Sequence, residues 1–147
     1  LWRHIRVLSA NSGRFLQRLA SRLPSTARPL FYLDAHWYAE LPLVEEVRTI
    51  RAFFPAAAIM IDDFEVPGRP FTYDTYGSFP LSLRSAAIRH ALRGTEVFFP
   101  AYDPESDSGR STGYVVVLPP SHRVTKRALA RFPLAMLAPW DGGLSAH

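Results

Sequence analysis

Residues 30–64 read LFYLDAHWYAELPLVEEVRTIRAFFPAAAIMIDDF and contain a complete strand–helix–strand pattern. The apolar runs at residues 30–33 and 57–61 are nearly continuous, which is typical of strands covered on both faces. Between them, a proline and two glutamates begin a segment that places Leu43, Val47 and Ile50 on one helical face. This pattern predicts two parallel, neighbouring strands joined by a right-handed helical crossover.

The rest of the chain extends the same alternation of strands and helices. Residues 12–23, SGRFLQRLASRL, predict a helix that Ser12 caps and Pro24 ends, and residues 82–94 predict a shorter helix that stops at Gly94. Three further apolar runs predict strands at residues 5–8, 97–99 and 114–118. The last two have no helix between them, which favours an antiparallel hairpin. The predicted fold is therefore an α/β domain of Rossmann-like type, with a mostly parallel sheet and a C-terminal antiparallel hairpin.

Composition limits the class of protein. The chain has 147 residues, no cysteine, 48% hydrophobic and 20% charged residues, which suits one domain with its own core. No apolar run approaches the roughly 20 residues that cross a bilayer, and the opening LWRHIRVLSA lacks the features of a signal peptide. We therefore expect a cytoplasmic protein without a membrane partner. The net charge of +4 comes from scattered arginines without a recognition motif, so we expect no nucleic-acid partner.

Carboxylates follow both strands of the central unit. Asp34 comes directly after the first strand, and Asp62 and Asp63 come directly after the second. Ligands of open parallel sheets bind beyond the carboxyl ends of the strands, and Mg²⁺ prefers oxygen ligands, so these three residues are candidate metal ligands. The spacing fits another interpretation equally well, in which Asp34 caps the next helix and Asp62 or Asp63 belongs to a turn.

Other polar and aromatic residues lie near the expected strand ends. His36 is a candidate base and Trp37 a candidate stacking partner for a flat ring, although the two also suit a partly buried anchoring pair. Asn11 and Ser12 follow the first apolar run, where they either contact a ligand or cap a helix. Residues 66–80, VPGRPFTYDTYGSFP, are either a lid or substrate wall, or a surface loop held by two phenylalanines.

The motifs LDAHW, IDDFEVPG, YDTYG and FFPAY…TGYVVV, in that order, resemble the later half of class I S-adenosylmethionine-dependent methyltransferases of the catechol O-methyltransferase type. The resemblance implies a sheet of strand order 3-2-1-4-5-7-6. Its fourth to seventh strands would be the runs at residues 30–33, 57–61, 97–99 and 114–118. The run at residues 5–8 would be the third strand, separated from these by strands that precede it.

The resemblance also implies roles for the candidate residues. Asp34, Asp62 and Asp63 would hold Mg²⁺, Trp37 would contact the adenine of S-adenosylmethionine, and Asn11 and Ser12 would touch the same ring. The lysine that serves these enzymes as base is absent, because Ala35 is inserted and Tyr38 follows Trp37. His36 is then the candidate catalytic base.

The glycine-rich loop that follows the first strand of this family is missing, since no GxGxxG occurs. The chain also begins with Leu1 inside an apparent strand, so we expect it to be part of a longer protein. Residues 1–120 would be a partial methyltransferase domain, and residues 121–147 a short basic helix and a loosely ordered tail. The expected activity is transfer of a methyl group to an oxygen of a small-molecule acceptor, impaired in this chain alone; the alternative is a non-catalytic α/β binding or assembly module.

Overall fold

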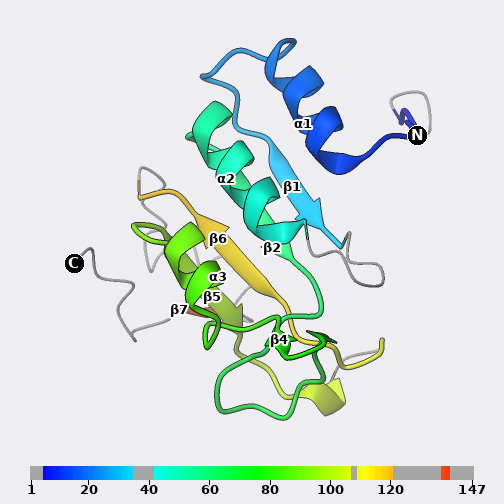
Figure 1. Cartoon of the computed structure of the whole chain (residues 1–147). Helices are drawn as coiled ribbons and strands as arrows, with labels where there is room; N and C mark the ends of the chain where they lie inside the picture. Colours follow the sequence, from blue (N-terminus) through cyan, green and yellow to red (C-terminus); the bar gives the residue numbers. More distant parts are fainter. Residues whose placement is uncertain (1–4, 35–41, 107–108, 121–136, 140–147) are drawn as a thin grey trace.

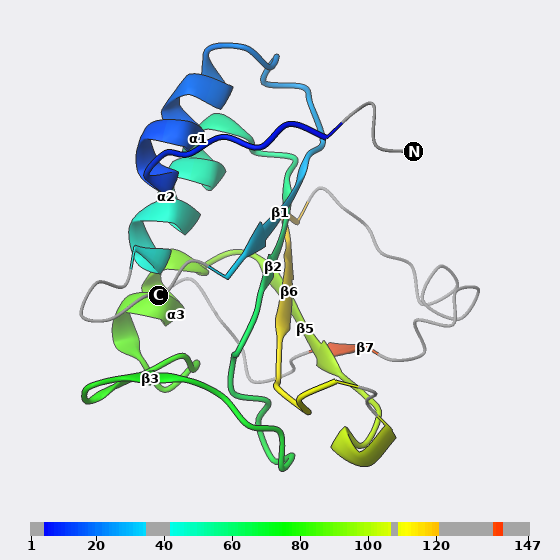
Figure 2. The same ribbon diagram turned by 90° about the vertical axis from the view of Figure 1, so that its right-hand side faces the viewer.

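The computed structural model describes residues 5–34, 42–106, 109–120 and 137–139, which form a mixed five-stranded sheet with three helices on one face (Figures 1 and 2). A separate two-stranded ribbon, β3 and β4, lies beyond one end of this sheet (Figure 1). In chain order the elements are α1 (Ser12–Ala20), β1 (Leu30–Leu33), α2 (Leu43–Phe53), β2 (Ala58–Ile61), β3 (Thr75–Tyr76), β4 (Phe79–Pro80), α3 (Ala86–Ala91), β5 (Glu96–Pro100), a 3-10 turn (Pro104–Ser106), β6 (Val115–Leu118) and β7 (Leu137–Pro139).

The central strand–helix–strand unit forms as predicted. β1 and β2 are parallel neighbours, with Leu30 opposite Ala58 and Leu33 opposite Ile61. The prediction that both faces of these strands are covered is wrong for the described part of the chain, because burial alternates along β1 and Tyr32 is exposed. The reason is visible in Figure 2, where α1, α2 and α3 all lie on the same side of the sheet.

The sheet is mixed rather than mostly parallel, which corrects the prediction. Its order is β1-β2-β6-β5-β7, and β6 runs antiparallel to both of its neighbours. The hairpin of β5 and β6 is therefore confirmed, but its second strand inserts between β2 and β5 and leaves β1–β2 as the parallel pair. β7 adds an antiparallel edge on β5, taken from the segment expected to be a loose tail.

The helices follow their sequence patterns with adjusted ends. α2 begins after Pro42 and carries two glutamates in its first turn, as predicted. The cap of α1 is Asn11 rather than Ser12, because the Asn11 side-chain oxygen accepts a hydrogen bond from the Gly13 N–H at 3.0 Å. α3 is only one and a half turns long, since Ser85 caps it and Leu92 ends it. None of the helices in the described segments is long and apolar enough to span a membrane.

The predicted strand at residues 5–8 does not form. These residues have no regular secondary structure, and Ile5, Val7 and Leu8 are 58%, 92% and 62% exposed. The free edge of β1 has no partner among the described strands, so this run has no sheet edge to extend.

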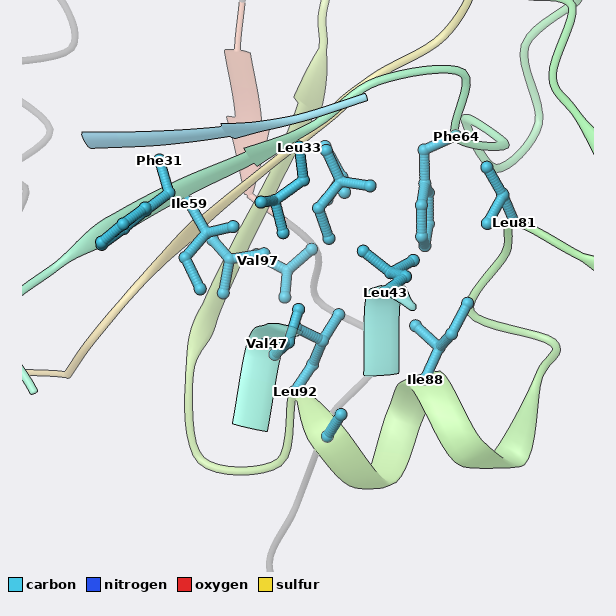
Figure 3. Packing of buried hydrophobic residues seen from close by; sticks show 14 of the residues in the cluster. Phe31, Leu33, Leu43, Val47, Ile59, Phe64, Leu81, Ile88, Leu92 and Val97 are labelled. Atoms are coloured by element: carbon cyan, nitrogen blue, oxygen red, sulfur yellow. The ribbon is translucent and has the colours of Figure 1, made fainter. Parts of the chain in front are cut away.

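The hydrophobic core lies between the sheet and the helical layer (Figure 3). Phe31 and Ile59 project from β1 and β2 toward Val47 of α2 and Ile88 of α3 (Figure 3), and all four are buried. Full burial of one such side chain stabilises a fold by about 1.5–3 kcal/mol. The helix layer thus fixes the two parallel strands, and with them the residues that follow their carboxyl ends.

Candidate site at the carboxyl ends of the parallel strands

The register of β1 and β2 brings two of the predicted carboxylates to one edge of the sheet. Leu33 pairs with Ile61, so Asp34 and Asp62 are the next residues on each strand. The backbone N–H of Asp62 donates to the Leu33 carbonyl at 3.0 Å, which extends the ladder by one residue. Asp63 then adopts a left-handed conformation with φ of 50°, which aspartate tolerates better than most residues and which ends the strand.

Asp62 is held by two hydrogen bonds. One carboxylate oxygen accepts from the Tyr32 hydroxyl, and the other accepts from the Asp63 N–H at 3.0 Å. Side chains two residues apart on a strand share a face, so Tyr32 lies on the same side of β1 as the position of Asp34. Tyr32 therefore connects the two strands on the face away from the helices.

Charge gathers around this tyrosine. The hydrogen bond to Asp62 raises the pKa of Tyr32 strongly, and burial and the negative charges of Asp62, Asp34 and Asp63 raise it further. The cause is that ionisation would replace a donor by a second anion beside carboxylates. Tyr32 is therefore a neutral hydrogen-bond donor throughout the physiological pH range.

A second tyrosine reports on the same cluster from another element. Burial is the largest cause that raises the pKa of Tyr76, followed by the charges of Asp74, Asp63 and Asp34. The Asp74 N–H donates to the Asp63 carbonyl at 3.0 Å, so the loop that carries β3 is bonded to the turn after β2. Asp34, Asp63 and Asp74 thus share one electrostatic neighbourhood.

The loop of residues 66–80 is anchored, which favours the surface-loop interpretation over a free lid. Phe71 is buried and packs edge-on against Tyr102 with ring centroids 5.6 Å apart, and Phe79 is partly buried. Gly113 approaches the start of this loop so closely that an added Cβ would lie 2.2 Å from the Phe64 carbonyl oxygen. A glycine is therefore required where the loop meets the strand that becomes β6.

A polar network holds the far side of the loop. Glu65 accepts hydrogen bonds from the Ser82 hydroxyl and from two nitrogens of Arg84, and Arg84 also donates to the Tyr73 hydroxyl at 2.9 Å. The hydrogen bond to Glu65 is the main reason that the pKa of Arg84 is raised. Glu65 is thus an anchor for the segment between β2 and α3, directed away from the carboxylate cluster into its own ion pair.

Sequence reasoning identified part of this arrangement. Asp34, Asp62 and Asp63 do gather at one sheet edge, whereas Tyr32, Asp74 and Tyr76 were not assigned to the site. Tyr32 was detectable, because it precedes Asp34 by two residues on a strand and so shares its face. The contribution of Asp74 depends on a long-range backbone contact that no local pattern indicates.

The remaining candidates lie outside the cluster or outside the described residues. Asn11 and Ser12 stand at the start of α1, where the Asn11 side chain is used for capping. His36 and Trp37, the predicted base and adenine contact, fall within residues 35–41, outside the described part of the chain. Their roles stay predictions.

The chemistry of the donors suits a hard divalent cation, since all are carboxylate oxygens. As placed, however, no three histidine, aspartate or glutamate side chains among the described residues form a group that could hold a metal ion. Both oxygens of Asp62 also accept hydrogen bonds already. The assignment of Asp34, Asp62 and Asp63 to Mg²⁺ therefore stays a prediction, and no step below is routed through a metal.

Comparison with known proteins adds no relative: no protein-family model, no curated protein and no solved structure matches the chain. The functional argument therefore depends on the arrangement of strands and side chains described above.

Proposed function

We propose that the chain is the later part of an S-adenosylmethionine-dependent methyltransferase domain that methylates an oxygen of a small molecule. The observation that carries this proposal is the strand order. In the order implied by the sequence resemblance, strands four, five, seven and six are consecutive. The four matching strands lie in the order β1-β2-β6-β5, with the last two of the chain order exchanged in space. A simple succession of strands would instead put β5 beside β2.

The carboxylate cluster gives a second line of support. Carboxylates near one sheet edge create a negative potential that attracts a cationic ligand. S-adenosylmethionine, when bound, supplies a methyl group on a positively charged sulfur. Asp62, held by Tyr32 and by the Asp63 N–H, is a positioned acceptor for the hydroxyl of an acceptor molecule. Holding that hydroxyl in line is the main contribution that such a site makes.

The proton of the acceptor hydroxyl requires a base. Tyr32 is a poor candidate, because its raised pKa keeps it a donor. We propose His36 on sequence grounds, as a neutral imidazole one short loop beyond β1. The cytoplasmic location and the absence of nucleic-acid and membrane partners belong to the same proposal and rest on sequence grounds too.

The test is methyl transfer by the whole protein that contains this chain. Labelled S-adenosylmethionine is supplied with a panel of phenols and catechols, and transfer to oxygen is measured with and without EDTA. Asp62→Asn should lower the rate about 100-fold, because it removes the positioned carboxylate. Glu105→Gln, which removes an exposed carboxylate in the 3-10 turn, is the matched control and should leave the rate unchanged.

The outcomes separate the parts of the proposal. Full activity of Asp62→Asn contradicts the role of the cluster, and full activity in EDTA contradicts the metal alone. For residues 1–147 by themselves we expect weak or no S-adenosylmethionine binding, because the glycine-rich loop is missing from the sequence. Micromolar binding in calorimetry would show that the cofactor site needs no further segment.

The alternative function is a non-catalytic α/β binding or assembly module. The sequence feature that favours it is the lack of any GxGxxG in the 147 residues. In that case Tyr32 and Asp62 form a structural hydrogen bond between two strands. Absence of both cofactor binding and methyl transfer in the whole protein would support this alternative.

A further inference from the structure

A pocket of about 470 Å³ lies between the N-terminal arm, residues 5–11, and α1 with the turn that follows it. Its apolar lining includes Leu8 of the arm and Phe15 and Leu19 of α1. Leu8 is 62% exposed, so the structure leaves this apolar surface open to solvent. The pocket shares none of its lining residues with the carboxylate cluster.

Three arginines surround the apolar lining. Arg6 comes from the arm, and Arg18 and Arg22 lie one helical turn apart along α1 and its continuation. No aspartate or glutamate lines the pocket. None of the three guanidinium groups has a hydrogen bond or ion pair with another described residue. Like charges four residues apart destabilise a helix, so the arrangement is unfavourable until an anion joins it.

The combination selects one class of ligand. Guanidinium groups pair with carboxylates through two parallel hydrogen bonds, and the apolar lining requires a hydrocarbon body. The volume lies in the lower part of the range of about 300–1,000 Å³ for small-molecule pockets, which suits a single chain better than a two-chain lipid. A second copy of this chain is disfavoured, because its net charge of +4 would meet the same arginines.

We propose that this pocket binds a free medium-chain fatty acid. The carboxylate lies among Arg6, Arg18 and Arg22, and the hydrocarbon chain lies on Leu8, Phe15 and Leu19. The site is independent of methyl transfer, because it uses the arm and α1 rather than the ends of β1 and β2.

The experiment is calorimetric titration of the chain with octanoate, decanoate and decanol, each below its aggregation threshold. We expect saturable binding of one decanoate per chain. Two additional CH₂ groups should tighten binding by up to about 15-fold from octanoate to decanoate. Decanol should bind at least about tenfold more weakly than decanoate, because it lacks the charge that the arginines pair with.

Variants assign the binding to this pocket. The double substitution Arg18→Gln and Arg22→Gln should weaken decanoate binding at least about tenfold while keeping good helix formers in α1. Arg28→Gln removes an exposed arginine that does not line the pocket, and should leave binding unchanged. Leu8→Ser, in the arm without regular secondary structure, should weaken decanoate binding without lowering the melting temperature.

Four results would overturn the proposal: no saturable decanoate binding, equal affinity for decanol, an equal loss in Arg28→Gln, or binding only to vesicles of anionic phospholipid. The last result would identify a membrane surface rather than a free fatty acid as the ligand. Failure of methyl transfer has no bearing on any of these outcomes.

Discussion

Two apolar runs that each precede a helix adopt different structures in this protein. The run that becomes β1 pairs with β2 and buries Phe31 and Leu33 under the helices, whereas the run at residues 5–8 has no regular secondary structure and leaves Val7 92% exposed. Their composition is similar, so intrinsic preference does not decide between them. The difference is the available edge: a short strand is stable only when a neighbouring strand and a covered face are both present.

The largest expected effect of this difference is on stability. Ile59, 2% exposed at the centre of the parallel pair, should lose about 2–5 kcal/mol of unfolding free energy when changed to alanine, because a cavity remains beside the helices. Val7→Ala removes apolar atoms from the arm and should change this free energy by less than about 0.5 kcal/mol. Chemical denaturation monitored by circular dichroism measures both values.

A loss in Val7→Ala comparable to that in Ile59→Ala would show that the arm is packed against the domain in solution. The comparison between the two runs would then fail. Equal small losses in both variants would instead show that the parallel pair contributes little to stability.

The same comparison explains how far the sequence could predict the fold. The strand–helix–strand unit was predictable, because its helix is amphipathic and its strands have each other as neighbours within about 30 residues. The strand at residues 5–8 was a wrong prediction, because an apolar run does not indicate whether an edge is free to pair with it. The insertion of β6 between β2 and β5 was not predictable from local patterns either, since hairpin strands give no indication of which other strand they join.

The candidate site divides in the same way. Asp34 and Asp62 were predictable as neighbours, because parallel strands in register end at the same edge. Asp74 and Tyr76 reach that edge only through the backbone hydrogen bond from Asp74 to Asp63, which joins residues eleven positions apart. Such a contact depends on how the intervening loop is anchored, and Glu65 and its partners provide that anchor through long-range hydrogen bonds.

A smaller effect is expected at the start of α1, where the arm ends. Asn11→Ala should lower the unfolding free energy by about 0.5–2 kcal/mol, because the Gly13 N–H loses its acceptor. Ser12→Ala, one residue later, should change it by less than about 0.5 kcal/mol, since the described Asn11 side chain makes the cap. Thermal unfolding of the two variants distinguishes these positions, and a larger loss in Ser12→Ala would restore the cap that the sequence suggested.

The smallest expected effect is a pH dependence that belongs to the carboxylate edge and is absent from the arm. The Asp62 hydrogen bond raises the pKa of Tyr32 above its unfolded value of about 10, so folding favours the protonated phenol. This contribution to stability is complete below pH 10 and is lost as pH rises above 10 toward the folded pKa, because the unfolded state releases its proton first. Tyr32 is 54% exposed, so solvent screening keeps the effect modest. Denaturation between pH 8 and about 11 should therefore show a steeper loss of stability in the wild-type protein than in Tyr32→Phe, whereas parallel curves would mean that Tyr32 and Asp62 do not share a hydrogen bond in solution.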